Sequence, residues 1–279
     1  HASLFGVYLF NKLGIDSQVI IASEFKNFPI KDSLIVAMTQ SGETMDLIEA
    51  LKIAKKQGLK IVSIVNVPYS TVQRMSDLSL EILAGQEVCV AATKSFVNQT
   101  ALLIYMGSLF GLNISIENLP SEIREIFSQE EKIIGIAKSL KDEKDIYVIG
   151  RGICYPAALE TALKIKELSY IHVEGMYGGE LKHGTIALIE NGIPVISLIY
   201  NNPDMISNTI EVKARGARVI AITNQRTNFD ENIIINTKNE AYFSILAVIV
   251  GQLLTYYISK EKNLPIDKPR NLAKSVTVK

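Results

Sequence analysis

Short apolar runs alternate along the chain with longer stretches whose apolar residues recur at helical spacing. The runs have the length of buried strands and predict strands at residues 17–22, 33–38, 60–65, 78–83 and 145–149. The longer stretches predict helices at residues 1–13, 45–57, 93–111, 122–140, 156–170 and 243–258. Strands that are apolar throughout and alternate with helices are typical of parallel sheets covered on both faces. The pattern therefore predicts an α/β fold.

The second half of the chain repeats the first. Residues 56–66 match residues 214–224, and both read as a helix end, a glycine stop, a buried strand and an asparagine. Such self-similarity predicts two tandem copies of one doubly wound parallel-sheet unit, an αβα sandwich. The domains that we expect are a first at residues 1–115, a second at 116–263 and a C-terminal tail at 264–279.

The two copies differ at two points. The second opens with a strand at 145–149 and a glycine loop at 150–152, and nothing comparable precedes the first helix at His1. We therefore expect that a strand and a polar turn of the first domain are missing from this chain. The first copy has a polar loop at 39–44 where the second has residues 199–203, without glycine and with one hydroxyl. Only the first loop is expected to bind a phosphate.

That loop reads Thr-Gln-Ser-Gly-Glu-Thr at residues 39–44 and leads from a predicted strand into a predicted helix. Such a loop points backbone N–H groups and the positive end of a helix dipole at one spot. Gly42 permits close backbone approach, while three hydroxyls and one amide add donors. These features suit a phosphate monoester held by neutral donors. The alternative is the polar N-cap of an ordinary helix.

A second candidate site lies in the predicted helix at 156–170. Glu160, Lys164 and Glu167 fall on one stripe of this helix, because they are spaced i, i+4 and i+7. The simpler interpretation is an exposed salt-bridged face. A catalytic stripe is favoured by the Gly-Gly-Glu-Leu-Lys-His-Gly turn that follows at 178–184, since a histidine between glycines in a charged turn is a candidate for chemistry.

The tail at 264–279 is too polar to be a core element. One interpretation is a frayed terminus. The other is a folded lid that delivers Lys274 to a carbonyl group. Pro265 and Pro269 stiffen the approach to this lysine, and the segment carries apolar anchors at Leu272, Val276 and Val278.

Composition narrows the class of protein. Hydrophobic residues make up 48 % of the 279 residues, and 29 basic side chains balance 29 acidic ones, which disfavours a nucleic-acid binder or a basic membrane surface. Cys89 and Cys154 fit a reducing compartment, the cytoplasm, and three histidines without a Cys-x-x-Cys pair disfavour structural zinc. The apolar run at 243–258 is short for a bilayer span and predicts a buried helix.

Several motifs together resemble the isomerase half of glucosamine-6-phosphate synthase, the glutamine–fructose-6-phosphate amidotransferase. They are the loop at 39–44, Ala-Thr-Lys-Ser-Phe at 92–96, Ala-Leu-Lys-Ile-Lys-Glu-Leu-Ser-Tyr at 162–170, Gly-Glu-Leu-Lys-His-Gly at 179–184 and Pro-Arg-Asn-Leu-Ala-Lys-Ser-Val-Thr-Val at 269–278. The resemblance covers essentially the whole chain. It implies two sugar isomerase (SIS) domains, each with a five-stranded sheet, and a homodimer with shared active sites. It implies no cofactor and no metal.

The resemblance also implies roles for individual residues. The residues implied to bind the sugar phosphate or line its site are Thr39, Gln40, Ser41, Thr44 and Val90. Glu167 is implied as the base that moves a proton between C1 and C2, supported by Lys164. His183 would assist ring opening from the neighbouring subunit, and Lys274 would form a Schiff base with the open-chain ketose.

This chain departs from the family pattern at Ala92, Thr185 and Lys279, where Ser, Pro and Glu are usual. It contains no glutaminase domain, and such a domain upstream of His1 would identify the natural protein as the synthase. The leading hypothesis is thus a phosphosugar isomerase domain acting on fructose 6-phosphate or glucosamine 6-phosphate. The alternatives are a stand-alone hexosamine-6-phosphate deaminase or isomerase, and a phosphosugar-sensing module without catalysis.

Overall fold

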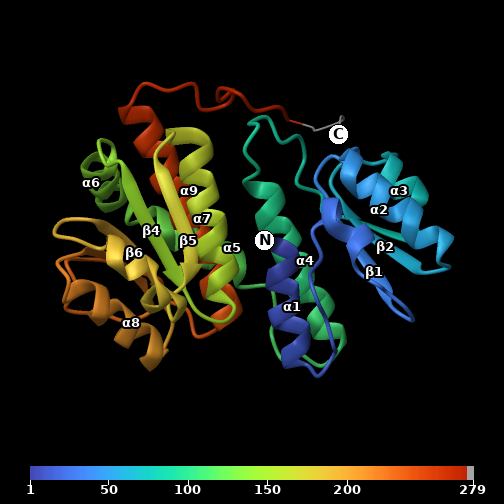
Figure 1. Ribbon diagram of the computed structural model, residues 1–279, viewed down its shortest axis with the longest axis horizontal. Helices are drawn as coiled ribbons and strands as arrows, with labels where there is room; N and C mark the ends of the chain where they lie inside the picture. Colours follow the sequence, from blue (N-terminus) through green and yellow to red (C-terminus); the bar gives the residue numbers. More distant parts are fainter. Residues whose placement is uncertain (275–279) are drawn as a thin grey trace. The chain divides into compact units, whose positions relative to one another are not determined.

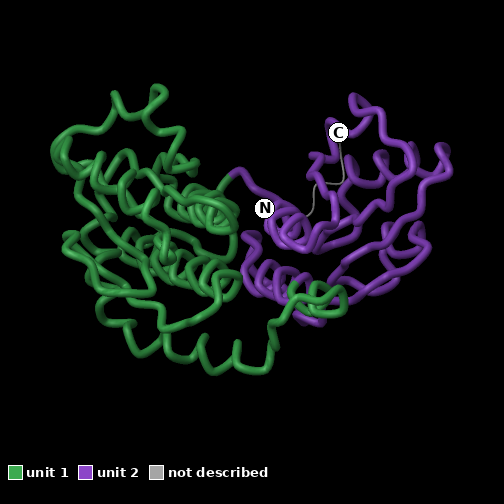
Figure 2. Tube along the Cα trace, turned by 90° about the horizontal axis from the view of Figure 1, so that it is seen from below, with its two compact units in different colours: residues 1, 104–270 green, residues 2–103, 271–279 purple. Residues whose placement is uncertain are grey.

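The computed structural model describes residues 1–274 and divides the chain into two compact units. Unit 1 comprises His1 and residues 104–270, and unit 2 comprises residues 2–103 together with residues 271–274 of the tail (Figure 2). Both units have the α/β organisation that the apolar runs predict, with parallel strands throughout.

Unit 1 is built on a five-stranded parallel sheet with the order β5-β4-β6-β7-β8. Its strands are β4 (Asp145–Gly150), β5 (His172–Tyr177), β6 (Pro194–Ile199), β7 (Arg218–Thr223) and β8 (Glu231–Ile234). The chain reverses its direction of winding between β4 and β6, so the unit is doubly wound. Every residue of β6 is buried, as expected for a strand covered on both faces.

Helices cover both faces of this sheet (Figure 1). On one face α7 (Cys154–Ser169) packs against α9 (Glu240–Glu261), which also contacts α5 (Leu119–Phe127) and α6 (Glu130–Leu140). On the other face α8 (Pro203–Lys213) packs on β6 and β7. Two short 3₁₀ helices, η2 (Glu180–His183) and η3 (Thr185–Leu188), follow β5.

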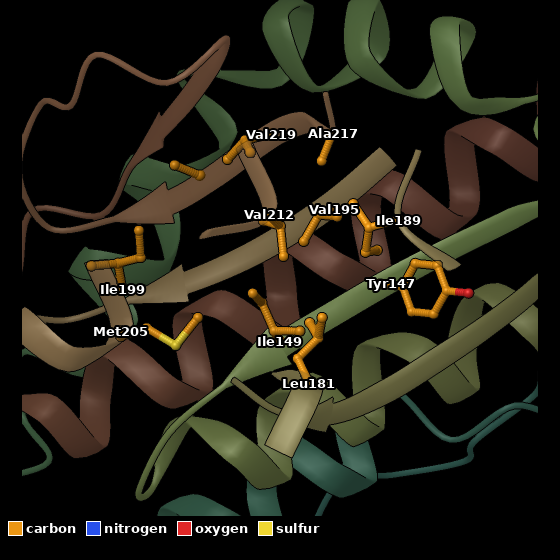
Figure 3. Close-up of a cluster of buried hydrophobic side chains, with 11 residues drawn as sticks. Tyr147, Ile149, Leu181, Ile189, Val195, Ile199, Met205, Val212, Ala217 and Val219 are labelled. Carbon is orange, nitrogen blue, oxygen red and sulfur yellow. The ribbon is translucent and has the colours of Figure 1, made fainter. Parts of the chain in front are cut away.

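The hydrophobic core beneath α8 shows how strand periodicity builds this layer (Figure 3). Alternate residues of neighbouring strands, including Tyr147, Ile149, Val195 and Val219, point into one cluster with Val212 of α8. The residues between them face the opposite layer, because side chains alternate along a strand. A one-residue slip of any strand would exchange these two sets.

The helix α9 is the buried helix predicted at 243–258. Its length and composition alone would allow it to cross a membrane, but 78 % of its most apolar window is buried inside the structure. Its N-terminus is capped by Asn239, whose Oδ1 accepts the N–H groups of Ala241 and Tyr242.

The single helix predicted at 122–140 is wrong, because this stretch forms α5 and α6 with a break at Ser128 and Gln129. The Gln129 side chain explains the break. Its Nε2 donates to the carbonyl of Ile234 at 2.6 Å, and its Oε1 accepts the Ile234 N–H at 3.1 Å. These two bonds hold the turn between α5 and α6 against the end of strand β8. The spacing of apolar residues, from which the helix was predicted, does not reveal such a side-chain contact.

Unit 2 contains a three-stranded parallel sheet with the order β1-β2-β3, among its described residues. The strands are β1 (Leu34–Met38), β2 (Lys60–Val65) and β3 (Leu78–Glu81). The helical elements are α1 (Ala2–Lys12), η1 (Ala22–Asn27), α2 (Met45–Lys56), α3 (Thr71–Met75) and the first part of α4 (Lys94–Leu109). Buried apolar residues of α2, α3 and the sheet form the core.

The strand predicted at 17–22 is wrong, and so is the five-stranded sheet that the resemblance implied for this domain. The internal repeat supplies the reason. By that repeat β1, β2 and β3 correspond to β6, β7 and β8, and residues 17–22 correspond to β5. In unit 1 β5 pairs with β4. The described residues of unit 2 contain no strand that corresponds to β4, so residues 17–22 have no ladder to join.

Candidate functional site

The loop at 39–44 connects β1 to α2 in unit 2, and its hydroxyls fold back onto its own backbone. Oγ1 of Thr39 accepts the Gly42 N–H at 3.1 Å, and Oγ of Ser41 accepts the Glu43 N–H at 3.2 Å. Gly42 has a φ of +69°, which favours glycine. Each hydroxyl that accepts a loop N–H retains its own O–H for donation, and this is the arrangement that a bound phosphate requires.

The alternative interpretation of this loop was an ordinary N-cap. Thr44 is the N-cap residue of α2, with extended backbone angles, but its side chain makes no capping hydrogen bond. The carbonyl of Gln40 is held instead by the N–H of Asn66 at the end of β2, with an N–O distance of 3.2 Å. The loop is thus fixed by the neighbouring strand, and the Thr44 hydroxyl is not used as a cap.

A second loop of unit 2 contains Val90 and leads into α4. It is held by Glu87, which is only 7 % exposed. The Glu87 carboxylate accepts the Ser95 N–H at 2.8 Å, the Thr93 N–H at 3.3 Å and the Thr93 hydroxyl at 3.0 Å. Burial by itself raises the pKa of Glu87, but the hydrogen bonds from Ser95 and Thr93 outweigh it and hold this pKa below its usual value.

We expect Glu87→Gln to lower the stability of the protein by about 1–3 kcal/mol at pH 7, because the buried N–H groups lose a charged acceptor. A depressed carboxyl pKa contributes stability that is present above the unfolded pKa, near 4.3, and is lost as the pH falls through the folded value. The difference between wild type and variant should therefore shrink below about pH 4. Urea unfolding at several pH values measures it, with the exposed Glu24→Gln as control. A difference that stays constant with pH would contradict this account.

The tail places Lys274 against the Val90 loop. The Lys274 Nζ donates to the carbonyl of Cys89 at 2.6 Å, and both residues belong to unit 2. Only the neutral form of a lysine amine can attack a carbonyl group. Residues 275–279, including Val276, Val278 and Lys279, lie outside the described residues.

Upstream of Lys274 the tail is anchored in unit 1. The Arg270 N–H donates to the Tyr170 hydroxyl at 2.8 Å, and the Arg270 guanidinium lies 4.2 Å from the centre of the Tyr170 ring. Tyr170 ends α7 with a φ of +59°, a conformation that turns the chain sharply. Pro269 beside this contact is buried. The described tail therefore does not fray at these residues.

The stripe on α7 is buried, so the exposed salt-bridged face is the wrong alternative. Lys164 is 2 % exposed and Glu160 is 4 % exposed. The Lys164 Nζ lies 2.7 Å from Oε2 of Glu167 and 3.3 Å from Oε1 of Glu160. The other oxygen of Glu160 lies 2.8 Å from Nδ1 of His1. Four ionisable side chains of unit 1 are therefore linked in a row: His1, Glu160, Lys164 and Glu167.

Electrostatic contacts favour the charged forms of Lys164 and Glu160. Burial by itself lowers the pKa of Lys164, but the carboxylates of Glu160 and Glu167 outweigh it and raise this pKa above its usual value. Burial likewise raises the pKa of Glu160, while the contacts with His1 and Lys164 prevail and lower it. The Lys164 ammonium thus lies beside Glu167, whose side chain is 21 % exposed and is the most accessible carboxylate of the stripe.

His183 lies elsewhere in unit 1, at the end of η2, and is exposed. Among residues 1–274 we find no hydrogen bond or ion pair from its ring to Glu160, Lys164 or Glu167. The structure thus brings three predicted residues together on α7 and leaves His183 on the surface. Glycines at 178, 179 and 184 surround its turn, as the sequence showed.

Sequence reasoning missed three residues that hold these sites. Glu87 belongs to none of the recognised motifs, and its hydrogen-bond partners, Thr93 and Ser95, follow six and eight residues later across a loop. His1 contacts a residue 159 positions away, which no local pattern reveals. Glu43 lies inside the recognised loop at 39–44, but as an acidic residue it was given no role in phosphate binding.

Comparisons with known proteins agree with this architecture. The SIS domain family matches residues 16–106 and 139–259 of the chain. The glutamine–fructose-6-phosphate aminotransferase (isomerizing) of Clostridium acetobutylicum is 40 % identical over the whole chain, and that of Methanothermobacter thermautotrophicus is 42 % identical. The chain spans about 50 % of the length of each of these relatives.

Solved structures extend the comparison. The C-terminal domain of glucosamine-fructose-6-phosphate aminotransferase from Francisella tularensis superposes with a TM-score of 0.89 and 30 % identity, covering 96 % of this chain and 82 % of that one. A glucosamine-6-phosphate deaminase from Thermotoga maritima, at 23 % identity, shares the fold with a TM-score of 0.85, covering 98 % of this chain and 86 % of its own. The chain therefore belongs to the SIS domain family and is related to the C-terminal domain of the glucosamine-fructose-6-phosphate aminotransferases.

Proposed function

We propose that this chain is a phosphosugar isomerase domain that interconverts the ketose fructose 6-phosphate and the corresponding aldose 6-phosphate. The observation that carries the proposal is the buried Lys164 ammonium fixed 2.7 Å from the Glu167 carboxylate. An aldose–ketose interconversion needs a carboxylate to move a proton between C1 and C2, with a cation near the developing negative charge. The relatives that match the whole chain are isomerizing aminotransferases.

Phosphate binding is assigned to unit 2. The binding residues in this proposal are Thr39, Gln40, Ser41 and Thr44, with Val90 in the loop that lines the sugar site. Within residues 1–274 the O–H groups of Thr39 and Ser41 donate no hydrogen bond, so they can donate to a phosphate in addition to the bonds that they accept. The N-terminus of α2 adds the positive end of its dipole. Binding by neutral donors lets a product leave more readily than a cluster of arginines would.

Proton transfer is assigned to Glu167, with Lys164 as the cation that supports it. In the open-chain ketose Glu167 removes the proton on C1, and the same proton or one from solvent is returned to C2. Lys274 forms the Schiff base, in which its amine adds to the C2 carbonyl and water leaves. Hydrolysis of this imine, or its displacement by ammonia, frees the lysine before C2 receives its proton. His183 assists ring opening, since imidazole titrates near neutral pH and can move a proton between ring oxygen and solvent.

Two further parts of the proposal concern assembly and the full-length protein. His183 is exposed on its own chain, which supports a homodimer in which this residue serves the neighbouring subunit. Because the chain spans about half of its relatives, a glutaminase domain upstream of His1 would supply ammonia and make the product glucosamine 6-phosphate. A cytoplasmic location is supported by Cys89 and Cys154, which form no disulfide with each other.

A hexosamine-6-phosphate deaminase is the second candidate, favoured by the shared fold of the Thermotoga maritima enzyme. The two activities separate in one assay. The purified chain is given fructose 6-phosphate with and without ammonia, and separately glucosamine 6-phosphate. Formation of glucose 6-phosphate without ammonia supports the isomerase. Ammonia release from glucosamine 6-phosphate as the faster reaction would favour the deaminase, and binding without turnover would indicate a sensing module.

We expect Ser41→Ala to weaken binding of fructose 6-phosphate by about 1–3 kcal/mol, or roughly 5- to 150-fold, because a donor to a charged group is lost. The effect should appear in KM, with kcat nearly unchanged, since the phosphate takes no part in proton transfer. Steady-state kinetics measure both constants. Ser33→Ala, at an exposed position before β1, is the matched control. An unchanged KM would remove Ser41 from the site.

A further inference from the structure

The phosphate loop contains one charged residue, and its negative charge would repel a phosphate. Glu43 is the only ionisable side chain in the loop at 39–44. A carboxylate a few ångströms from a phosphate dianion would oppose binding by Coulomb repulsion. The presence of Glu43 at this place therefore needs a physical reason.

The Glu43 side chain is engaged with the next turn of unit 2. Its Oε1 accepts the N–H of Thr71 at 2.7 Å. Thr71 is the first residue of α3, and its N–H has no partner within the helix, so the Glu43 carboxylate satisfies one of the unpaired N–H groups at this helix end. Arg74 on the same helix adds a favourable charge. A carboxylate at the start of a helix is also favoured by the helix dipole.

A second bond runs beside the first. The carbonyl of Gly42 accepts the N–H of Val72 at 3.0 Å, so two consecutive loop residues bond to two consecutive residues of α3. The loop also lies directly against Ser70. A Cβ atom at Gly42 would lie 2.0 Å from the Ser70 Oγ, and Ser70 is 3 % exposed. Its Oγ has no hydrogen-bond partner among the described residues, so Ser70 fills space beneath the loop.

We propose that Glu43 is a positioning residue that clamps the phosphate loop onto the turn at 70–72. The bond from the Thr71 N–H to the Glu43 carboxylate holds the backbone of Gly42 and Glu43 in place. Because the hydroxyls of Thr39 and Ser41 accept the N–H groups of these two residues, their positions are fixed as well. This inference rests on the proposed phosphate-binding function of the loop, and it assigns Glu43 a role that requires no contact with the sugar.

Whether Glu43→Ala weakens or strengthens phosphate binding distinguishes the clamp from a charge that only repels the phosphate. If Glu43 acted on the phosphate only through its charge, Glu43→Ala would strengthen phosphate binding, because a repulsion is removed. If Glu43 holds the loop, the same substitution weakens binding, because the donors lose their arrangement. Glu43→Gln separates the two effects further, since its amide oxygen can still accept the Thr71 N–H without the charge.

The test is calorimetric titration of the purified chain with glucose 6-phosphate and with inorganic phosphate. We expect Glu43→Ala to bind both roughly tenfold or more weakly and Glu43→Gln to lie between it and wild type. Glu49→Ala on α2, whose carboxylate pairs with Lys52 at 2.7 Å, should change binding less than about twofold. Binding that is equal or tighter in Glu43→Ala would overturn the clamp.

Hydrogen exchange provides a readout that needs no ligand. The Thr71 and Val72 amides should exchange faster in Glu43→Ala than in wild type, while amides of β2 stay unchanged, which also shows that the variant is folded. If wild type binds neither ligand, the proposed phosphate site fails, and exchange at Thr71 still decides whether the clamp exists. Unchanged exchange at both amides would overturn the clamp whatever the binding result.

Discussion

A Glu167→Gln chain should convert fructose 6-phosphate about 10²- to 10⁴-fold more slowly than wild type, with little change in KM. The amide has nearly the shape of the carboxylate but cannot accept the proton from C1. The variant should still fold, because Lys164 keeps its buried partner Glu160 and the amide oxygen can accept a hydrogen bond from its ammonium. Steady-state kinetics measure the effect, and the exposed Glu190→Gln in the same unit is the control.

The same variant tests the dimer. If His183 serves the neighbouring subunit, a mixture of Glu167→Gln and His183→Ala chains should regain activity, because heterodimers contain one site with both native residues. Recovery is measured after the two chains have been unfolded and refolded together. Activity that stays absent, with heterodimers shown to form by mass spectrometry, would place His183 in the site of its own subunit. Near wild-type activity of Glu167→Gln alone would remove this residue from proton transfer.

Lys274→Arg should abolish covalent trapping of the sugar. In wild type, borohydride reduction in the presence of fructose 6-phosphate is expected to fix a sugar on Lys274, because the reagent reduces the Schiff base to a stable amine. A guanidinium stays protonated and cannot attack the carbonyl group. Peptide mass spectrometry measures the adduct. The exposed Lys268→Arg in the same tail is the matched control and should leave trapping intact.

The contact that Lys274 makes in the structure gives this prediction its physical basis. Its Nζ donates to the Cys89 carbonyl, so the side chain already extends from the tail into the loop that Glu87 holds. An adduct on Lys164 or Lys268 would show that a different lysine attacks the substrate. A chain that isomerises without any adduct would be a plain acid–base isomerase that depends on Glu167 alone.

The sequence was sufficient where a pattern is local and repeated. Apolar runs predicted β1, β2 and β4 to within a residue or two, because strands buried on both faces are apolar throughout. The spacing of Glu160, Lys164 and Glu167 placed them on one side of a helix. Spacing alone could not tell whether that side is exposed, since the partner helix α9 comes more than 70 residues later.

The sequence was insufficient where a tertiary contact decides the local structure. Residues 17–22 have the apolar character of a strand, but a strand needs a neighbour for its hydrogen bonds. Gln129 ends α5 because its amide bonds to the backbone of Ile234, 105 positions away. His1 contributes to a candidate site through a contact of the same kind, with Glu160, 159 positions away. Such contacts follow from the fold and leave no periodic trace in the chain.

The proposed isomerisation requires a carboxylate of α7 to move a proton between C1 and C2 of a hexose 6-phosphate. The most direct measurement is proton NMR of fructose 6-phosphate incubated with the purified chain in deuterium oxide, without ammonia. We expect glucose 6-phosphate to appear, with deuterium at C2 in those turnovers in which solvent supplies the proton, at a rate reduced at least about 100-fold in Glu167→Gln. Glucose 6-phosphate formed equally fast by Glu167→Gln, or no product and no deuterium from a chain that binds the sugar phosphate, would contradict it.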